Sequence, residues 1–191
     1  MDRFKLLPHP KNPSSGLYEI SAALKPENAF DEKSTLYIDF EIQGHLQPLI
    51  FPEPEEECGR RDELWKATCF EVFVHDGEKS YREFNFAPSG NWACYQFDDY
   101  RHGMSRPPLF APPELTIQKS RNRFLMTIRL SARDFLPPSL TDTVSLGFSS
   151  VLKTQTHLEY WALAHHSETP DFHSPETFII PLHKAPAKRT H

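Results

Sequence analysis

Short runs of alternating apolar and polar residues, separated by proline and turn residues, dominate this 191-residue sequence. Within Thr35–Gln43, for example, Leu36, Ile38, Phe40 and Ile42 alternate with polar or amphipathic residues. A period of two is typical of a β-strand that buries one face. The 18 prolines outnumber the 7 glycines and cluster between such runs, where a missing backbone N–H interrupts no strand pairing. The pattern predicts an all-β protein with proline-rich loops.

We expect about ten short strands and almost no helix. The predicted strands are Leu17–Leu24, Thr35–Gln43, Cys69–Val74, Tyr81–Ala87, Trp92–Phe97, Leu115–Ser120, Arg123–Leu130, Thr143–Leu152, Leu158–Leu163 and Phe178–Leu182. Ser131–Phe135 is expected to form a short helix that ends before Pro137, and Arg60–Lys66 a single helical turn. An antiparallel β-sandwich of the jelly-roll or immunoglobulin-like kind is the favoured architecture, with a closed barrel as the alternative.

The length suits one sizeable domain with a true core. We expect residues 1–16 to form an N-terminal extension, residues 17–182 the sandwich, and residues 183–191 a disordered C-terminal tail. That tail holds the basic cluster of the sequence. The chain therefore reads as a single domain without repeats.

Composition argues against several classes of protein. A net charge of −5 and a pI of about 6.0 disfavour a nucleic-acid-binding surface. No apolar run reaches the roughly 18 residues of a membrane span, and no signal peptide is visible, so we expect a cytoplasmic protein that does not enter a membrane. Cys58, Cys69 and Cys94 are too widely spaced for a zinc or redox motif. The sequence does not indicate an oligomeric state.

Two of the predicted strands place polar side chains on a common face. We expect Val72 to pair with Phe84, because this register keeps the apolar side chains together. The opposite parity would bury the carboxylate of Glu83 among apolar side chains, at a large cost in desolvation. The predicted polar face consists of Glu71, Glu83 and Asn85.

The turn before the next strand decides which aromatic residue joins this face. Residues 87–91 can form a two-residue loop, or a type I turn followed by a bulge at Gly90. The first places Trp92 on the polar face and the second places Tyr95 there. We favour Trp92, because Tyr95 and Phe97 then join the apolar core.

Strand Thr143–Leu152 has one bulky face and one nearly bare face, which carries Ser145, Gly147 and Ser149. Two interpretations stay open. The bare face leaves room for a bound molecule, or Gly147 accommodates a bulky neighbouring side chain.

A polar face beside aromatic rings suits a sugar or a similar polar metabolite. Sugar rings stack on indole through their flat C–H faces, and their hydroxyl groups pair with carboxylates, amides and guanidinium groups. The ordinary alternative is that the tryptophans belong to the core. The candidate ligand-binding residues are Trp65, Glu71, Glu83, Asn85, Trp92, Arg101, Trp161, His165 and His173.

A longer motif runs through this region. It comprises Trp65, then Thr68-Cys69-Phe70-Glu71-Val72-Phe73, then Tyr81-x-Glu83-x-Asn85-Phe86-x-Pro88-x-Gly90-x-Trp92, Tyr95-x-Phe97, Tyr100-Arg101-x-Gly103-Met104, and later Pro170 to Phe178. The motif resembles the DOMON-like family, which is related to the family-nine carbohydrate-binding modules. The resemblance implies a β-sandwich that binds haem or carbohydrate on a concave sheet. It also implies that Trp65 and Trp161 match the two tryptophans that sandwich the sugar in those modules.

We therefore predict a non-catalytic protein that binds a small carbohydrate or similar metabolite without a cofactor. One alternative is non-covalent haem binding through Met104 and one of His102, His165, His166 or His173. A second alternative is a glycosidase-like enzyme that uses Glu71 and Glu83.

A metal site is a separate possibility. His165, His166, Glu168, Asp171 and His173 lie close together in sequence, but without the spacing of a tetrahedral metal motif. We favour a solvated loop for this segment.

Overall fold

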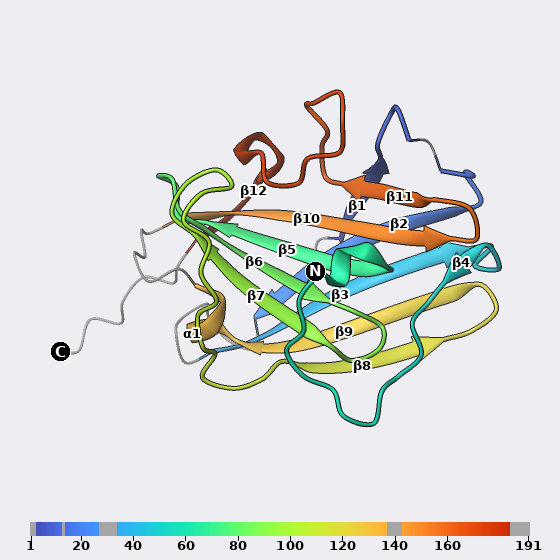
Figure 1. Cartoon of the computed structure of the whole chain (residues 1–191), viewed down its shortest axis with the longest axis horizontal. Coiled ribbons are helices and arrows are strands. Elements are labelled where there is room, and N and C mark those ends of the chain that lie inside the picture. The colour runs from blue at the N-terminus through green and yellow to red at the C-terminus, as the bar shows by residue number, and fades with distance from the viewer. Residues whose placement is uncertain (1–2, 13, 27–33, 137–142, 184–191) are drawn as a thin grey trace.

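The computed structural model describes residues 3–12, 14–26, 34–136 and 143–183. Within these ranges, twelve strands pair antiparallel in one curled sheet, accompanied by one short helix (Figure 1). The sheet folds into two facing layers, so the predicted all-β antiparallel sandwich is confirmed.

The elements follow the predicted runs closely. The strands are β1 (Arg3–Pro8), β2 (Tyr18–Pro26), β3 (Thr35–Gly44), β4 (Leu49–Ile50), β5 (Cys69–His75), β6 (Tyr81–Phe86), β7 (Trp92–Phe97), β8 (Glu114–Lys119), β9 (Arg123–Ser131), β10 (Thr143–Thr154), β11 (Leu158–Ala162) and β12 (Ile180–His183). The helix is α1 (Ala132–Phe135), and the 3-10 turns are η1 (Leu64–Lys66) and η2 (Pro175–Thr177).

Strand β1 joins the two layers. The front layer has the order β7-β6-β5-β10-β11 and the back layer β2-β3-β9-β8, while β4 and β12 both pair with β10. Leu7 of β1 pairs with Ala162 of β11, and Leu6 pairs with Ile20 of β2. Arg3–Pro8 is therefore an integral strand, although it falls within the expected extension 1–16. The fully buried Leu6 explains why this segment belongs to the sheet.

The main core fills the space between the layers. Val72 pairs with Phe84, as predicted, and both side chains are fully buried in this core. The same register places Glu71 opposite Asn85 on the outer face of the front layer. A smaller aromatic cluster, which includes Phe73 and Tyr81, covers that outer face.

The turn between β6 and β7 corrects the expected parity of β7. The backbone N–H of Ala87 donates to the carbonyl of Asn91 at 2.9 Å, and Gly90 has a φ of 93°. This is the bulged turn that only glycine adopts easily. Tyr95 consequently lies opposite Glu83 on the outer face, whereas Trp92 lies opposite the core residue Phe86. The preference for Trp92 on the polar face was wrong.

The nearly bare face of β10 accommodates a bulky neighbour. A Cβ atom at Gly147 would lie 2.6 Å from Cδ1 of Phe178, which packs against this point of the strand. The structure therefore supports the interpretation that Gly147 accommodates a bulky neighbouring side chain. Phe178 precedes β12, which begins at Ile180, and its ring belongs to the outer cluster.

The predicted tail 183–191 lies outside the described residues from position 184 onward. Across the ranges that the structure describes, the helices are too short and too polar to cross a membrane.

Candidate ligand-binding site

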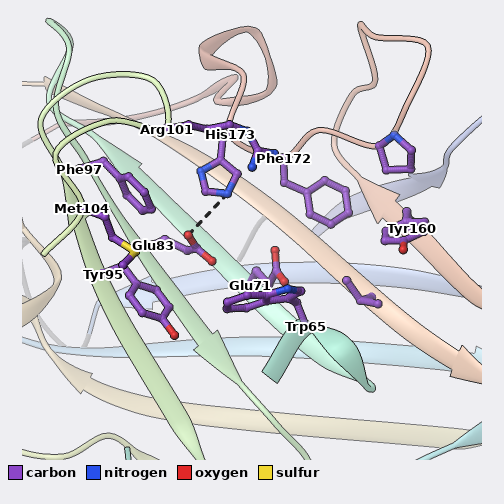
Figure 2. Close-up of a pocket in the computed structure, with 12 residues that line it drawn as sticks. Trp65, Glu71, Glu83, Tyr95, Phe97, Arg101, Met104, Tyr160, Phe172 and His173 are labelled. Carbon is purple, nitrogen blue, oxygen red and sulfur yellow. Dashed lines mark ion pairs between the residues drawn. The ribbon is translucent and has the colours of Figure 1, made fainter. Parts of the chain in front are cut away.

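A cavity of about 400 Å³ opens on the outer face of the front layer (Figure 2). Its volume falls within the usual range for small-molecule sites. The lining combines strand residues with residues from η1 and from the loops that follow β7 and β11. The residues are Trp65, Glu71, Glu83, Tyr95, Phe97, Arg101, Met104, Val151, Tyr160, Pro170, Phe172 and His173.

Two carboxyl groups form the floor of the cavity. Glu71 on β5 is 3% exposed, and Glu83 on the neighbouring β6 is 5% exposed. The hydroxyl of Ser149 donates to Oε2 of Glu71 at 3.1 Å, and Nδ2 of Asn85 donates to Oε1 of Glu83 at 2.7 Å. Within the described part of the chain, Oε1 of Glu71 has no hydrogen-bond partner. One carboxylate oxygen thus stays available to a ligand.

Burial changes the acidity of this pair. Desolvation raises the pKa of Glu71, and the negative charge of Glu83 raises it further. Desolvation also raises the pKa of Glu83, although the hydrogen bond from Asn85 and the charge of Arg101 oppose that change. The pair therefore retains a proton to higher pH than exposed glutamates do. A protonated carboxyl group can donate a hydrogen bond as well as accept one.

A chain of polar contacts leads from the rim to Glu83. The backbone N–H of Arg101 donates to the hydroxyl of Tyr81 at 3.1 Å, and this hydroxyl lies 2.8 Å from Nδ1 of His173. Burial raises the pKa of Tyr81 to about 12, so the phenol keeps its proton, and we assign that proton to a hydrogen bond with Nδ1. The ring proton of His173 is then on Nε2, which lies 3.7 Å from Oε2 of Glu83. Burial lowers the pKa of His173 to about 4, so the ring is neutral at neutral pH.

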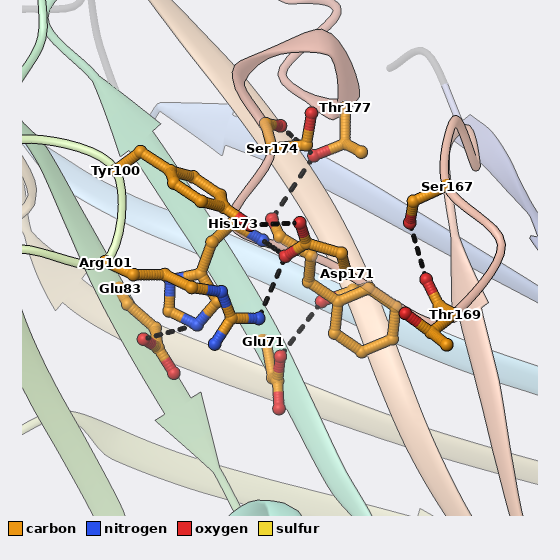
Figure 3. Close-up of polar contacts among 12 residues, drawn as sticks. Glu71, Glu83, Tyr100, Arg101, Ser167, Thr169, Asp171, His173, Ser174 and Thr177 are labelled. Carbon is orange, nitrogen blue, oxygen red and sulfur yellow. Dashed lines mark hydrogen bonds and ion pairs between the residues drawn. The ribbon is translucent and has the colours of Figure 1, made fainter.

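An ion pair fastens the two loops at the rim (Figure 3). Asp171 accepts hydrogen bonds from Nη2 of Arg101 at 2.9 Å and from the hydroxyl of Tyr100 at 2.7 Å. Burial opposes ionisation of Asp171, but hydrogen bonds from Tyr100, Arg101 and the backbone of His173 outweigh it and lower its pKa. Arg101 has a φ of 52°, a conformation that non-glycine residues seldom adopt. These contacts fix the turn in the position where Arg101 reaches the cavity.

Aromatic side chains form the walls. Trp65 is 40% exposed and meets Tyr95 edge to face, with ring centroids 6.3 Å apart. The hydroxyl of Tyr95 donates to Asp62 at 2.8 Å, which fixes the ring. Figure 2 shows Phe172 and Tyr160 on the other side of the carboxyl pair, with centroids 6.2 Å apart. A ligand on the floor would therefore lie between aromatic rings.

Five of the nine predicted site residues line this cavity, namely Trp65, Glu71, Glu83, Arg101 and His173. Asn85 is fully buried behind the lining and orients Glu83. Trp92 packs against the core between the layers, as its parity requires.

Trp161 also lies away from the cavity, so it does not face Trp65 across a ligand as the resemblance implied. It is 3% exposed in the main core, and its indole N–H donates to Glu159 at 3.1 Å. Successive strand residues point to opposite faces, so its neighbour Tyr160 takes the cavity side. The sequence reasoning missed Tyr160, although the alternation in Leu158–Leu163 carried that signal.

The histidine-rich loop does not gather around one point. Nε2 of His165 lies 2.8 Å from the carbonyl of Leu7, and its ring lies beside Phe172 instead of lining the cavity. His166 faces Glu176, and Glu168 pairs with Lys11. Among the described residues, no group of three or more potential ligands is placed to hold a metal ion.

The cavity does not fit haem well, although Met104 and His173 both line it. Nδ1 of His173 is engaged by Tyr81, and Nε2 faces Glu83. The floor that a macrocycle would cover carries two buried carboxyl groups, which need polar partners.

Comparison with known proteins supports the fold. No protein-family model matches the chain, and no curated protein matches it. A crystal structure at 2.70 Å resolution of a candidate carbohydrate-binding protein from Bacteroides uniformis ATCC 8492 is similar, with a TM-score of 0.67 and 14% identity. The similarity covers 97% of this chain and 87% of that one. At this identity the match shows a common fold, while the DOMON-like resemblance and the cytoplasmic location stay predictions.

Proposed function

We propose that this chain is a non-catalytic binding protein for a small carbohydrate or a similar polar metabolite. The observation that carries the proposal is the buried pair Glu71 and Glu83 on a cavity floor beside the exposed indole of Trp65. Carboxyl oxygens match ring hydroxyls, and an exposed indole face matches the C–H face of a sugar. The fold shared with the Bacteroides protein gives further support.

The floor can both accept hydrogen bonds from ligand hydroxyl groups and donate hydrogen bonds to them. A hydroxyl group donates one hydrogen bond and accepts others. Oε1 of Glu71 offers a free acceptor, and a proton retained on the pair offers a donor. Arg101 at the rim adds donors for a second part of the ligand.

Glycosidases also use two carboxyl groups, which makes hydrolysis the competing function. In such enzymes the surroundings separate the two pKa values, so that one group is an acid while the other is ionised. Here burial raises the pKa of both Glu71 and Glu83, and the charge of Glu83 raises that of Glu71 further. The acidity of the pair fits either function, and the hydrolysis assay below decides between them.

Isothermal titration against a panel of mono- and disaccharides tests the proposal. We expect saturable binding that Trp65→Ala weakens about tenfold or more, because a truncated aromatic contact in a site commonly costs that much. Phe110→Ala is the matched control, since it removes another exposed aromatic ring that does not line the cavity. Absence of binding across the panel, or equal losses in both variants, would overturn the proposal. Release of product from aryl glycosides that Glu83→Gln abolishes would establish catalysis instead.

A further inference from the structure

The floor of the cavity has two acidic groups, and the cation nearest them, Arg101, is ion-paired with another residue. The guanidinium of Arg101 is held by Asp171 at 2.9 Å, so these two charges balance each other. His173 is uncharged near neutral pH. Within the described part of the chain, Glu71 forms no ion pair, and the ring of His173 is the partner that approaches Glu83, at 3.7 Å. The charge of Arg101 lowers the pKa of both floor carboxyl groups, but Asp171 shares that charge. When ionised, the two floor carboxylates together with Asp171 therefore outnumber the positive charge beside them.

The walls add a second feature that attracts positive charge. Five aromatic residues line the same cavity, namely Trp65, Tyr95, Phe97, Tyr160 and Phe172. The faces of such rings carry partial negative charge and bind ammonium groups. Carboxylates below and aromatic rings on the sides are a combination that favours a cationic ligand over a neutral one.

We infer that the ligand carries a positively charged amino group and that Glu71, assisted by Glu83, binds this group on the cavity floor. The inference rests on the proposed function and narrows it: an amino sugar offers both the ring that Trp65 accommodates and the ammonium that the floor lacks. Oε1 of Glu71 is the acceptor for that ammonium, because Oε2 already accepts from Ser149.

Burial makes this charge match important. An ionised carboxylate that is only 3% exposed needs a partner, since burial limits its contact with water and Arg101 is shared with Asp171. A ligand ammonium supplies that partner in a charge-assisted hydrogen bond. A neutral sugar replaces water around the floor without supplying the charge.

The test compares sugars that differ only in the amino group. Glucose with glucosamine and galactose with galactosamine form matched pairs, N-acetylglucosamine is the uncharged derivative, and 1,5-diaminopentane is an amine without a sugar ring. We expect each amino sugar to bind about tenfold or more tightly than its neutral partner, the usual scale of a charged hydrogen bond. N-acetylation should remove the advantage.

Variants connect the preference to the floor. Glu71→Gln keeps the shape but removes the charge, so it should reduce the preference for the amino sugar to about twofold or less. Glu114→Gln, an exposed position on β8, should leave the preference unchanged.

The outcomes separate the inference from the proposed function. Equal or tighter binding of the neutral sugars overturns the inference and leaves carbohydrate binding in place. Binding of 1,5-diaminopentane without binding of any sugar supports the cationic ligand and overturns the carbohydrate. Failure of all these probes overturns both.

Discussion

The hydroxyl oxygen of Tyr81 lies 2.8 Å from Nδ1 of His173, and this contact joins a strand of the floor to the loop that closes the cavity. The same hydroxyl accepts a hydrogen bond from the backbone of Arg101, so one buried oxygen connects three segments. This arrangement explains how the loops that carry Arg101 and His173, which are far apart in sequence, are held side by side.

Tyr81→Phe should destabilise the protein by about 1–3 kcal/mol, because it leaves the buried Nδ1 of His173 and the N–H of Arg101 without their partner. Urea unfolding measures the change. Tyr100→Phe removes another hydroxyl, which is bonded to Asp171 at the exposed rim, and should cost less. The assigned contact is contradicted if Tyr81→Phe matches the wild type in stability and in the ¹⁵N shifts of His173.

Glu71→Gln should become more stable relative to the wild type as the pH rises. The folded pKa of Glu71 lies above its ordinary value of 4.5, so the native state binds more protons than the unfolded state above that value. The stability linked to this group is present below the ordinary pKa and is lost as the pH rises through the raised one. Urea titrations from about pH 5 to about pH 9 should show the difference growing. If the difference in unfolding free energy between Glu71→Gln and the wild type stays constant with pH, the pKa of Glu71 is not raised. Glu114→Gln, at an exposed position, is the control.

Gly147→Ala should destabilise the protein by about 1–3 kcal/mol, the usual cost of overpacking. Its methyl group would lie 2.6 Å from the ring of Phe178, which is wedged against the outer cluster. Thermal unfolding measures the effect. Gly59→Ala is the matched control, because no atom lies within 4 Å of its Cβ position. Equal unfolding temperatures for the two variants would mean that Phe178 does not fill this space.

Trp161→Phe should lower stability but leave ligand affinity within about twofold, because the indole lies in the core and bonds to the buried Glu159. Trp65→Ala should do the reverse, since its ring is 40% exposed above the floor. Unfolding and titration experiments on both variants separate the two roles. Loss of affinity in Trp161→Phe without loss of stability would mean that Trp161 contacts the ligand.

The polar face was predictable because its register had one acceptable solution. Pairing Val72 with Phe84 buries apolar side chains, and a slip by one residue would bury Glu83 among them. For β7, neither parity buries a charged group at a cost, because Trp92 and Tyr95 are both aromatic and either can pack in a core. The sequence therefore did not decide which of them faces the polar side. The bulge at Gly90 decided between them.

Two further features depended on contacts that sequence patterns do not reveal. The core side of β11 carries Glu159, and this buried acid is stabilised by the hydroxyl of Tyr18, 141 positions away. Glu159 and Trp161 share the inner face of this strand, and a charged residue there is normally expected to face solvent, so the alternation was assigned to the wrong face. Strand β1 was missed because Leu6 is the one buried residue among its six, which leaves no clear alternation to detect.

Because β1 joins the two layers of the sheet, its pairing affects the order in which the strands fold. Leu7 on this strand meets the end of β11, and its carbonyl contacts His165, 158 positions later in the chain. During synthesis, β1 can pair with β2 early but cannot pair with β11 until the roughly 150 residues between them have emerged from the ribosome. Contacts of such long range slow folding, since distant segments must meet before they stabilise each other. The wall that carries Tyr160 and Phe172 is therefore completed late, and a nascent chain lacks the formed cavity until β11 and the loop after it have been synthesised.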